Sequence, residues 1–330
     1  MPNADAIPAE SRPRALFFGT PEFAVPCLSA LAELCEVALV VTQPDRPAGR
    51  GMKLAPPPVK LRAAELGIPV LQPTKVRTPE FAAQLREQRA ELAVVVAYGR
   101  ILPQAVLDAP RLGCVNVHAS LLPKYRGAAP IQWSIVHGEA ETGVCLMQMD
   151  AGLDTGPVLA RAATPIGADE TAGELAERLS QLGAELVRRE LPRFWAGALS
   201  PVPQDDARAT LAPILEKRNG ALDFAADAQA IHDRVRGLSP WPGAYAQLID
   251  AEGLRTRVKV HRTRVGEQAP AEAAPGTLLG SSPEGLLVAC GRGQLAITEL
   301  QFEGGKRLTA AALLAGRRLP TGARFAKPDA

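Results

Sequence analysis

The stretch LAVVVAY, residues 92–98, is the longest apolar run in the chain. A helix that crosses a bilayer needs roughly 20 apolar residues, so this run is far too short to span one. Its length and composition are typical of a strand buried inside a sheet. Four more runs are predicted to be strands for the same reason: ALFFG (15–19), EVALVVT (36–42), CVNVH (114–118) and VCLMQMD (144–150).

Helix-like segments alternate with these strands. They are EFAVPCLSALAEL (22–34), PPVKLRAAELG (57–67), PEFAAQLREQRA (79–90) and AAPIQWSIVHG (128–138). A long amphipathic helix is then predicted over 169–199. Strands that alternate with helices favour an α/β fold, a doubly wound and mostly parallel sheet with helices on both faces.

The pattern changes after residue 200. Residues 201–222 are rich in Pro, Asp and Arg and predict a linker. One helix is expected over 227–237, and short alternating runs follow it: AYAQLID (244–250), RTRVKVH (255–261), GTLLG (276–280), GLLVAC (285–290) and QLAITEL (294–300). Such runs predict a small OB-like β-barrel. We therefore expect a flexible tail over 1–12, a first domain over 13–200, a linker over 201–222 and a second domain over 223–330.

Composition excludes several classes of protein. The chain is 47% hydrophobic and 22% charged, with a net charge of +2, which rules out a disordered or fibrous protein. Its five cysteines include no C-x-x-C pair, so we expect buried, reduced thiols and neither a disulfide framework nor a zinc site. The first residues lack an apolar signal-peptide core, which predicts a cytoplasmic protein. The first strand-to-helix turn has a single glycine, Gly19, and so lacks the dinucleotide-binding fingerprint.

Asn116 and His118 are two positions apart at the end of the predicted strand 114–118. Side chains alternate along a strand, so these two share one face. Ligands of open α/β sheets bind beyond the carboxyl ends of the strands, where an Asn and a His can both stabilise an oxyanion in acyl transfer. The alternative is structural: Asn116 caps a turn, and His118 is a core histidine with its hydrogen bonds satisfied.

A second polar loop follows the strand 144–150. It contains Asp150 and Asp154, with Gly152 and Gly156 between and after them, and glycine allows the backbone to come close to another group. Asp150 is expected to build the turn. Asp154 is a candidate to orient His118, because a carboxylate beside an imidazole fixes the ring.

Four motifs give the chain a resemblance to a known family. They are N-x-H at 116–118, SLLPKYRGAAP (120–130), DAGLDTGP (150–157) and TQPDRPAGRGMKLAPPPVK (42–60). From about Pro13 to its end the chain resembles the methionyl-tRNA formyltransferases, which belong to the folate-dependent formyltransferases. The resemblance implies transfer of the formyl group of 10-formyltetrahydrofolate to the α-amine of initiator methionyl-tRNA. It also implies a monomer that needs no metal and acts away from membranes.

The resemblance also implies roles for residues near the first site. Asn116 and His118 would donate hydrogen bonds to the oxyanion, and Asp154 would hold His118 and organise a water that relays the proton. Ser120, Leu121, Leu122 and Pro123 would line the folate pocket, although Leu121 and Leu122 fit a plain apolar core equally well. Lys124, Tyr125 and Arg126 would either meet the tRNA or form a solvated turn.

Two groups of cations are implied to bind tRNA. Arg46, Arg50 and Lys53 lie in the loop 42–60, where prolines and glycines predict no regular structure. Arg255, Arg257 and Lys259 alternate along the run 255–261 and share one strand face with His261. The plain alternatives are a solvated loop and a solvated edge strand, since edge strands use Lys and Arg to avoid aggregation.

Three other functions compete with this interpretation. A sugar-nucleotide formyltransferase would share the N-x-H and SLLP motifs, but it needs neither the cationic loop nor the basic strand. A phosphoribosylglycinamide formyltransferase would usually end near the middle of this chain. A tRNA-binding protein on an inactive scaffold would not need Asn116, His118 and Asp154 together.

Overall fold

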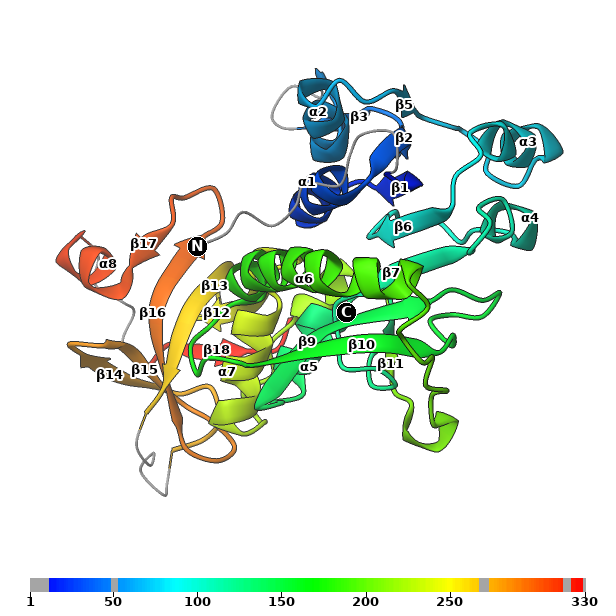
Figure 1. Ribbon diagram of the computed structural model, residues 1–330. Helices are drawn as coiled ribbons and strands as arrows, with labels where there is room; N and C mark the ends of the chain where they lie inside the picture. The colour runs from blue at the N-terminus through cyan, green and yellow to red at the C-terminus, as the bar shows by residue number, and fades with distance from the viewer. Residues whose placement is uncertain (1–11, 49–52, 267–272, 317–321, 329–330) are drawn as a thin grey trace, which may run out of the picture. The chain divides into compact units, whose positions relative to one another are not determined.

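The computed structural model describes residues 12–48, 53–266, 273–316 and 322–328 (Figure 1). The chain forms two compact units. The first comprises Met1–Ala128, Thr142–Thr164 and Ala176–Ala212, and the second Ala129–Glu141, Pro165–Leu175 and Pro213–Ala330. The expected tail over 1–12 lies outside the described residues except for its last position. The other expected boundaries, at 200 and 222, stay predictions.

The first unit is built on one seven-stranded sheet. Its strand order is β10(Val158–Pro165), β9(Glu141–Gln148), β7(Cys114–His118), β6(Leu92–Val96), β1(Arg14–Gly19), β2(Glu36–Val41), β5(Val70–Leu71). The pairs β6–β7, β1–β6, β1–β2 and β2–β5 are parallel, and β7–β9 is antiparallel. The predicted mostly parallel sheet is confirmed, and the run 92–96 lies near its centre with every side chain buried.

Helices cover both faces of this sheet, as predicted. On one face α3(Pro79–Glu87) and α4(Gln104–Leu107) pack into a core that includes Leu16 and Phe18 of β1. On the other face lie α1(Val25–Leu34) and part of α6(Ala172–Trp195). A Cβ built on Gly183 of α6 would lie 3.1 Å from Val117 Cγ1 of β7 and 3.4 Å from Cys27 Sγ of α1. This unit also contains the 3-10 turn η2(Glu22–Ala24) and α2(Pro58–Glu65).

One expectation for this unit was wrong. The loop 42–60 contains a short antiparallel ribbon, β3(Arg46–Ala48) with β4(Lys53–Ala55), in which Pro47 is opposite Leu54. Proline is tolerated in edge strands, and both strands of a two-stranded ribbon are edges. The prolines therefore restrict this loop without preventing regular pairing.

The second unit contains an antiparallel sheet that closes on itself. Its order is β14(Leu278–Ser282), β15(Gly285–Ala289), β16(Gln294–Phe302), β13(Arg255–Val265), β12(Ala244–Ile249), β18(Arg324–Ala326), with β17(Leu308–Thr309) paired to β16. Thr277 bridges Arg324, and the Phe325 amide donates a 2.7 Å hydrogen bond to the Gly276 carbonyl. These contacts join the last strand to the start of β14, and the predicted small OB-like barrel is confirmed.

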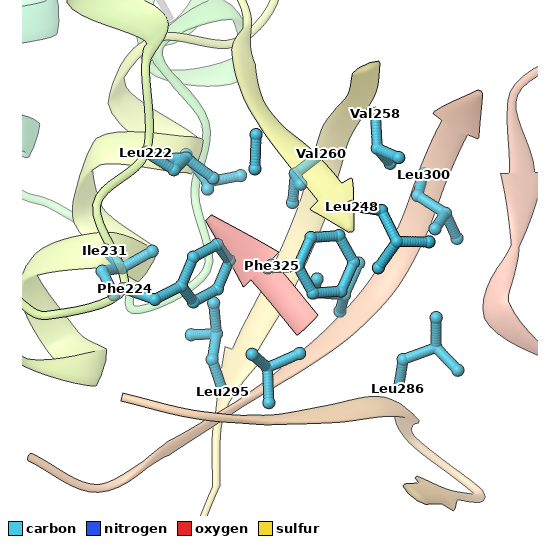
Figure 2. Packing of buried hydrophobic residues seen from close by; sticks show 14 of the residues in the cluster. Leu222, Phe224, Ile231, Leu248, Val258, Val260, Leu286, Leu295, Leu300 and Phe325 are labelled. Atoms are coloured by element: carbon cyan, nitrogen blue, oxygen red, sulfur yellow. The ribbon is translucent and has the colours of Figure 1, made fainter. Parts of the chain in front are cut away.

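The barrel has its own hydrophobic core (Figure 2). Phe224 and Phe325 stack with ring centroids 5.4 Å apart, and Val258 and Val260 project inward from β13. The helix α7(Ala228–Gly237) adds Ile231 to this core and packs on α5(Pro130–Val136). The helix α8(Ala310–Gly316), which the sequence pattern did not predict, also buries Ala310 and Leu313 there.

The predicted linker 201–222 contains little regular secondary structure, but it is hydrogen-bonded to other segments. It holds the turn η3(Asp206–Arg208), the strand β11(Leu211–Ala212) and the turn η4(Lys217–Gly220). Within the first unit, β11 pairs in parallel with β8(Arg126–Gly127). The described part of the chain has no helix that is long and apolar enough to cross a membrane.

Candidate active site

The structure brings Asn116, His118 and Asp154 together in the first unit. Asn116 and His118 end strand β7 on the same face, and Asp154 belongs to the loop between β9 and β10. The Asn116 Nδ2 lies 3.5 Å from Asp154 Oδ1, and the His118 Nδ1 lies 3.7 Å from Asp154 Oδ2. One carboxylate therefore faces both side chains. Its place beside His118 was expected from the sequence, and its approach to Asn116 was not.

The orientation of His118 is fixed by the backbone. Its Nε2 lies 2.9 Å from the carbonyl oxygen of Tyr125, and the ring is buried. A carbonyl oxygen only accepts hydrogen bonds, so Nε2 carries a proton and donates. This leaves Nδ1, on the Asp154 side, as the ring nitrogen available for chemistry.

Asp154 is held in place by a backbone amide. The Gly127 nitrogen donates a 2.8 Å hydrogen bond to Asp154 Oδ2. Gly127 has a φ of 126°, and a Cβ there would lie only 2.6 Å from the Ala212 carbonyl oxygen of β11. Only glycine fits this close approach. Asp154 itself has a φ of 54°, in the left-handed region that Asp tolerates better than most residues.

Gln204, in the predicted linker, is hydrogen-bonded to the backbone of the loop that carries Asp154. Gln204 Nε2 donates to the carbonyls of Asp154, at 2.8 Å, and Gly156, at 2.7 Å. The Gln204 Oε1 accepts from Arg126 Nη2 at 2.9 Å, and Arg126 also pairs with Asp206 at 2.7 Å. Arg126 is buried, so it is not part of a solvated turn, which was one of its two predicted roles. A contact of Arg126 with tRNA stays a prediction.

These supporting contacts were missed because they carry little sequence signal. Tyr125 and Gly127 act through backbone atoms, which every residue type has. Gln204 lies 50 residues from Asp154, in a stretch without periodicity. The only hint was Gly127 itself, between Arg126 and two alanines.

The predicted folate-binding residues follow β7 directly. Ser120 is fully buried, and its hydroxyl donates a 2.6 Å hydrogen bond to the Lys124 carbonyl. Leu122 is buried in a cluster with Cys145, Met147 and Val158, while Leu121 and Pro123 are half-buried. Leu121 and Pro123 thus keep surface available for a ligand, and Leu122 also serves the core. Their role toward folate stays a prediction.

The cationic loop is described only in part. Arg46 is exposed, and its Nη2 donates to Gln43 Oε1 at 3.2 Å. Lys53 begins β4, but its side chain is not among the described parts of the structure. Arg50 lies outside the described residues. A role of this loop toward tRNA stays a prediction.

The second cationic group lies on β13 as predicted. Arg255, Arg257 and Lys259 are exposed, while Val258 and Val260 are buried in the barrel. The edge-strand alternative is wrong, because β13 pairs with β12 on one side and β16 on the other (Figure 1). Beyond Val260 the register shifts, so His261 leaves the alternation and is half-buried.

The cysteines take no part in this chemistry. All five are free and buried, as expected, and burial raises the pKa of the Cys27 and Cys114 thiols to about 12. A thiol with such a pKa is not a nucleophile near neutral pH. Among the described residues, no three His, Cys, Asp or Glu side chains form a group suited to a metal ion.

The fold and the site together define a formyl transferase. Residues 14–191 match the family described as formyl transferase, and residues 214–318 match the formyl transferase C-terminal domain. Solved structures agree on the fold at low identity. HypX from Aquifex aeolicus has a TM-score of 0.61 at 20% identity and covers 92% of this chain and 47% of its own. WlaRD, a sugar 3N-formyl transferase, has a TM-score of 0.61 at 16% identity and covers 87% of this chain and 97% of its own.

Sequence relatives identify the family more narrowly. The methionyl-tRNA formyltransferase of Sorangium cellulosum is 55% identical over 309 residues, which cover 94% of this chain and 98% of that protein. The methionyl-tRNA formyltransferase of Myxococcus xanthus is 52% identical over 95% of this chain and 98% of its own length. The chain therefore belongs to the methionyl-tRNA formyltransferase family.

Proposed function

We propose that the chain transfers the formyl group of 10-formyltetrahydrofolate to the α-amino group of initiator methionyl-tRNA, giving N-formylmethionyl-tRNA for translation initiation. The observation that carries this proposal is the identity of about half of all residues, over almost the whole chain, with proteins of that name. The convergence of Asn116, His118 and Asp154 supports it, because a bare scaffold would not need all three.

Asn116 has the simplest role in this reaction. When the amine attacks the formyl carbon, a C–N bond forms and the formyl oxygen becomes an oxyanion. The Asn116 Nδ2 is a donor at the carboxyl end of β7, where it stabilises that charge. Asp154 Oδ1, at 3.5 Å, keeps the amide turned with its nitrogen toward the site.

His118 and Asp154 act on the oxyanion and on the proton that leaves the amine. The Tyr125 carbonyl occupies His118 Nε2, so Nδ1 faces the reacting groups and Asp154. His118 supplies the second donor to the oxyanion through Nδ1, and the Asp154 carboxylate at 3.7 Å holds the ring in the orientation that this requires. Asp154 also orients the water that carries the amine proton to N10 of the folate as the old C–N bond breaks.

The donor substrate fits the residues beside this group. Leu121 and Pro123 offer half-buried apolar surface for a pterin, a few residues from Asn116. The Ser120 hydroxyl is used by the Lys124 carbonyl, so it supports the pocket wall more than it anchors a ligand. A HypX structure is described as a complex with tetrahydrofolic acid, which is in keeping with a folate donor in this fold.

The sugar-nucleotide alternative has weaker support. WlaRD resembles this chain at 16% identity, which speaks for the fold alone. The exposed cations Arg255, Arg257 and Lys259 give the barrel a basic face suited to a polyanion such as tRNA. A single sugar nucleotide has no use for such a face.

Mass analysis of the aminoacyl group tests the proposal. Initiator methionyl-tRNA, incubated with enzyme and 10-formyltetrahydrofolate, is expected to gain one formyl group. An unmodified methionyl group together with a formylated amino-sugar nucleotide would overturn the assignment. The monomeric state and the cytoplasmic location stay predictions, to be checked by sedimentation and cell fractionation.

A further inference from the structure

A pocket of about 480 Å³ lies on the outside of the barrel, within the second unit. Its wall comes from η4, from the segment between α7 and β12, and from neighbouring strands β12, β13 and β16. The side chains that matter are Lys217, Trp241, Tyr245, Arg257, Lys259 and Glu303. The basic face of β13 therefore continues into a hollow that contains two aromatic rings.

Trp241 leaves about half of its side chain exposed, so it contributes less to the hydrophobic core than a tryptophan usually does. It is 53% exposed, whereas a ring of this size is usually well buried. Pro240 and Pro242 flank it, and each proline ring fixes its own φ, so the segment has little freedom. The Gly243 amide donates a 2.9 Å hydrogen bond to the Leu238 carbonyl, which anchors the segment to the end of α7. The indole is therefore presented to solvent on a rigid support.

The same segment is packed against η4, which carries Lys217. A Cβ built on Gly220 would lie 2.0 Å from the Gly243 carbonyl oxygen, so only glycine allows this approach. The Leu222 amide donates a 2.9 Å hydrogen bond to the Tyr245 carbonyl. Lys217 and Trp241 are thus held near one another by the backbone.

The pocket carries an excess of positive charge. It has three cations, Lys217, Arg257 and Lys259, against one carboxylate, Glu303. The Arg257 guanidinium lies 3.8 Å from the centre of the Tyr245 ring, which keeps it extended along the wall. Among the described residues, neither Lys217 nor Lys259 forms an ion pair, so both can meet a phosphate.

We propose that this pocket binds one unpaired nucleotide of the tRNA substrate, with its base stacked on Trp241 and its phosphates near Lys217 and Lys259. The proposal rests on the proposed function and deepens it. Proteins that hold unpaired nucleic acid combine exposed aromatic rings with cations in this manner. A peptide partner or a second copy of this chain would not need the cations.

The test compares Trp241→Ala and Trp241→Phe with the control Leu254→Ala. Leu254 is also a large exposed apolar residue of the second unit, at 65% exposure, and it does not line the pocket. Binding of initiator tRNA is measured over a salt series, and the quenching of tryptophan fluorescence by the tRNA is recorded. Circular dichroism establishes that each variant is folded.

Loss of the ring in Trp241→Ala is expected to weaken tRNA binding about 10- to 100-fold, the range typical of a single stacked base. The slope of log affinity against log salt should not change, because stacking releases no counterions. Trp241→Phe should restore most of the affinity and lose most of the fluorescence quenching. Leu254→Ala should behave as the wild type.

The proposal would be overturned by full tRNA affinity in Trp241→Ala, or by equal fluorescence quenching in wild type and Trp241→Phe. It would also be overturned if Trp241→Ala bound tRNA normally but lost a self-association that the wild type shows in sedimentation. Failure of the proposed function looks different. In that case the wild-type enzyme itself leaves methionyl-tRNA unformylated, whatever the state of Trp241.

Discussion

Asp154 Oδ2 accepts a 2.8 Å hydrogen bond from the backbone nitrogen of Gly127, and the same oxygen faces His118 Nδ1 at 3.7 Å. The carboxylate is therefore positioned by a main-chain group and not by the histidine. His118 in turn is positioned by the Tyr125 carbonyl. The loop 125–127 thus sets the geometry of both residues, and this shared support makes the roles of the side chains separable by mutation.

We expect His118→Ala and Asp154→Asn each to lower turnover by orders of magnitude and to leave folate binding nearly unchanged. The reason is that both act on charge that develops in the transition state. In Asp154→Asn the amide oxygen still accepts from Gly127, but its NH2 group then faces the Asn116 Nδ2, another donor. Turnover assays and fluorescence titration with a folate analogue check this. A parallel collapse of folate affinity would make these residues pocket walls.

The support loop makes a second prediction. Gly127→Ala should lower both activity and stability, by about 1–3 kcal/mol in the free energy of unfolding, because its Cβ meets the Ala212 carbonyl at 2.6 Å in a strained backbone region. Gly197→Ala is the matched control. Gly197 also has a positive φ, 68°, but nothing lies within 4 Å of a Cβ there. Equal losses in both variants would show that φ alone, and not the contact with β11, explains the effect.

Much of the fold followed from periodicity, because burial selects residue types. The run 92–96 and the alternation of Arg255, Arg257 and Lys259 both appear as predicted. The ribbon 46–55 did not, since prolines disfavour strands on average but not at edges. In the site, the side chains Asn116, His118 and Asp154 could be found from their chemistry. Their supports could not, because Tyr125 and Gly127 contribute only backbone atoms.

The start of α6 makes the stability of the protein depend on pH. Glu174 Oε2 accepts hydrogen bonds of 2.8 Å from the Thr171 amide and hydroxyl, and the Glu174 amide donates back to the Thr171 hydroxyl at 3.3 Å, a capping box. These bonds, with the Arg262 ion pair, lower the pKa of Glu174 from 4.5 to about 2. The folded pKa lies below the unfolded one, so this stabilisation is present above pH 4.5 and is lost as the pH falls toward 2.

Glu174→Gln isolates that contribution, because Gln keeps an acceptor for Thr171 but has no charge. The side chain is 47% exposed, so water screens the pair, and we expect a loss of only about 0.5–1 kcal/mol at pH 7. The difference from wild type in thermal unfolding should shrink between pH 4.5 and 2. Glu177→Gln is the matched control, because it removes an exposed carboxylate from the same helix and leaves the Thr171 capping box intact. A difference that is constant with pH would assign the effect to packing.

The basic face of β13 makes the last prediction. Each cation that neutralises a phosphate releases counterions, so the triple change of Arg255, Arg257 and Lys259 to Ser should flatten the dependence of log affinity on log salt by about 0.7–0.9 per lost contact. Contacts to phosphate position RNA without reading its sequence. The Michaelis constant should therefore rise by a similar factor for every tRNA, while that for folate stays unchanged.

The loss of three positive charges would by itself weaken tRNA binding, so the control variant must also lose three cations. Arg218, Arg292 and Arg307 suit this purpose, since each is paired with a carboxylate of the second unit, Glu216, Asp227 and Glu299 respectively. Their triple change to Ser removes the same charge from sites already neutralised. Filter binding across a salt series distinguishes the two variants. If both flatten the slope equally, β13 contributes only to the general field of the protein, and the phosphate contacts of the barrel must lie on another face.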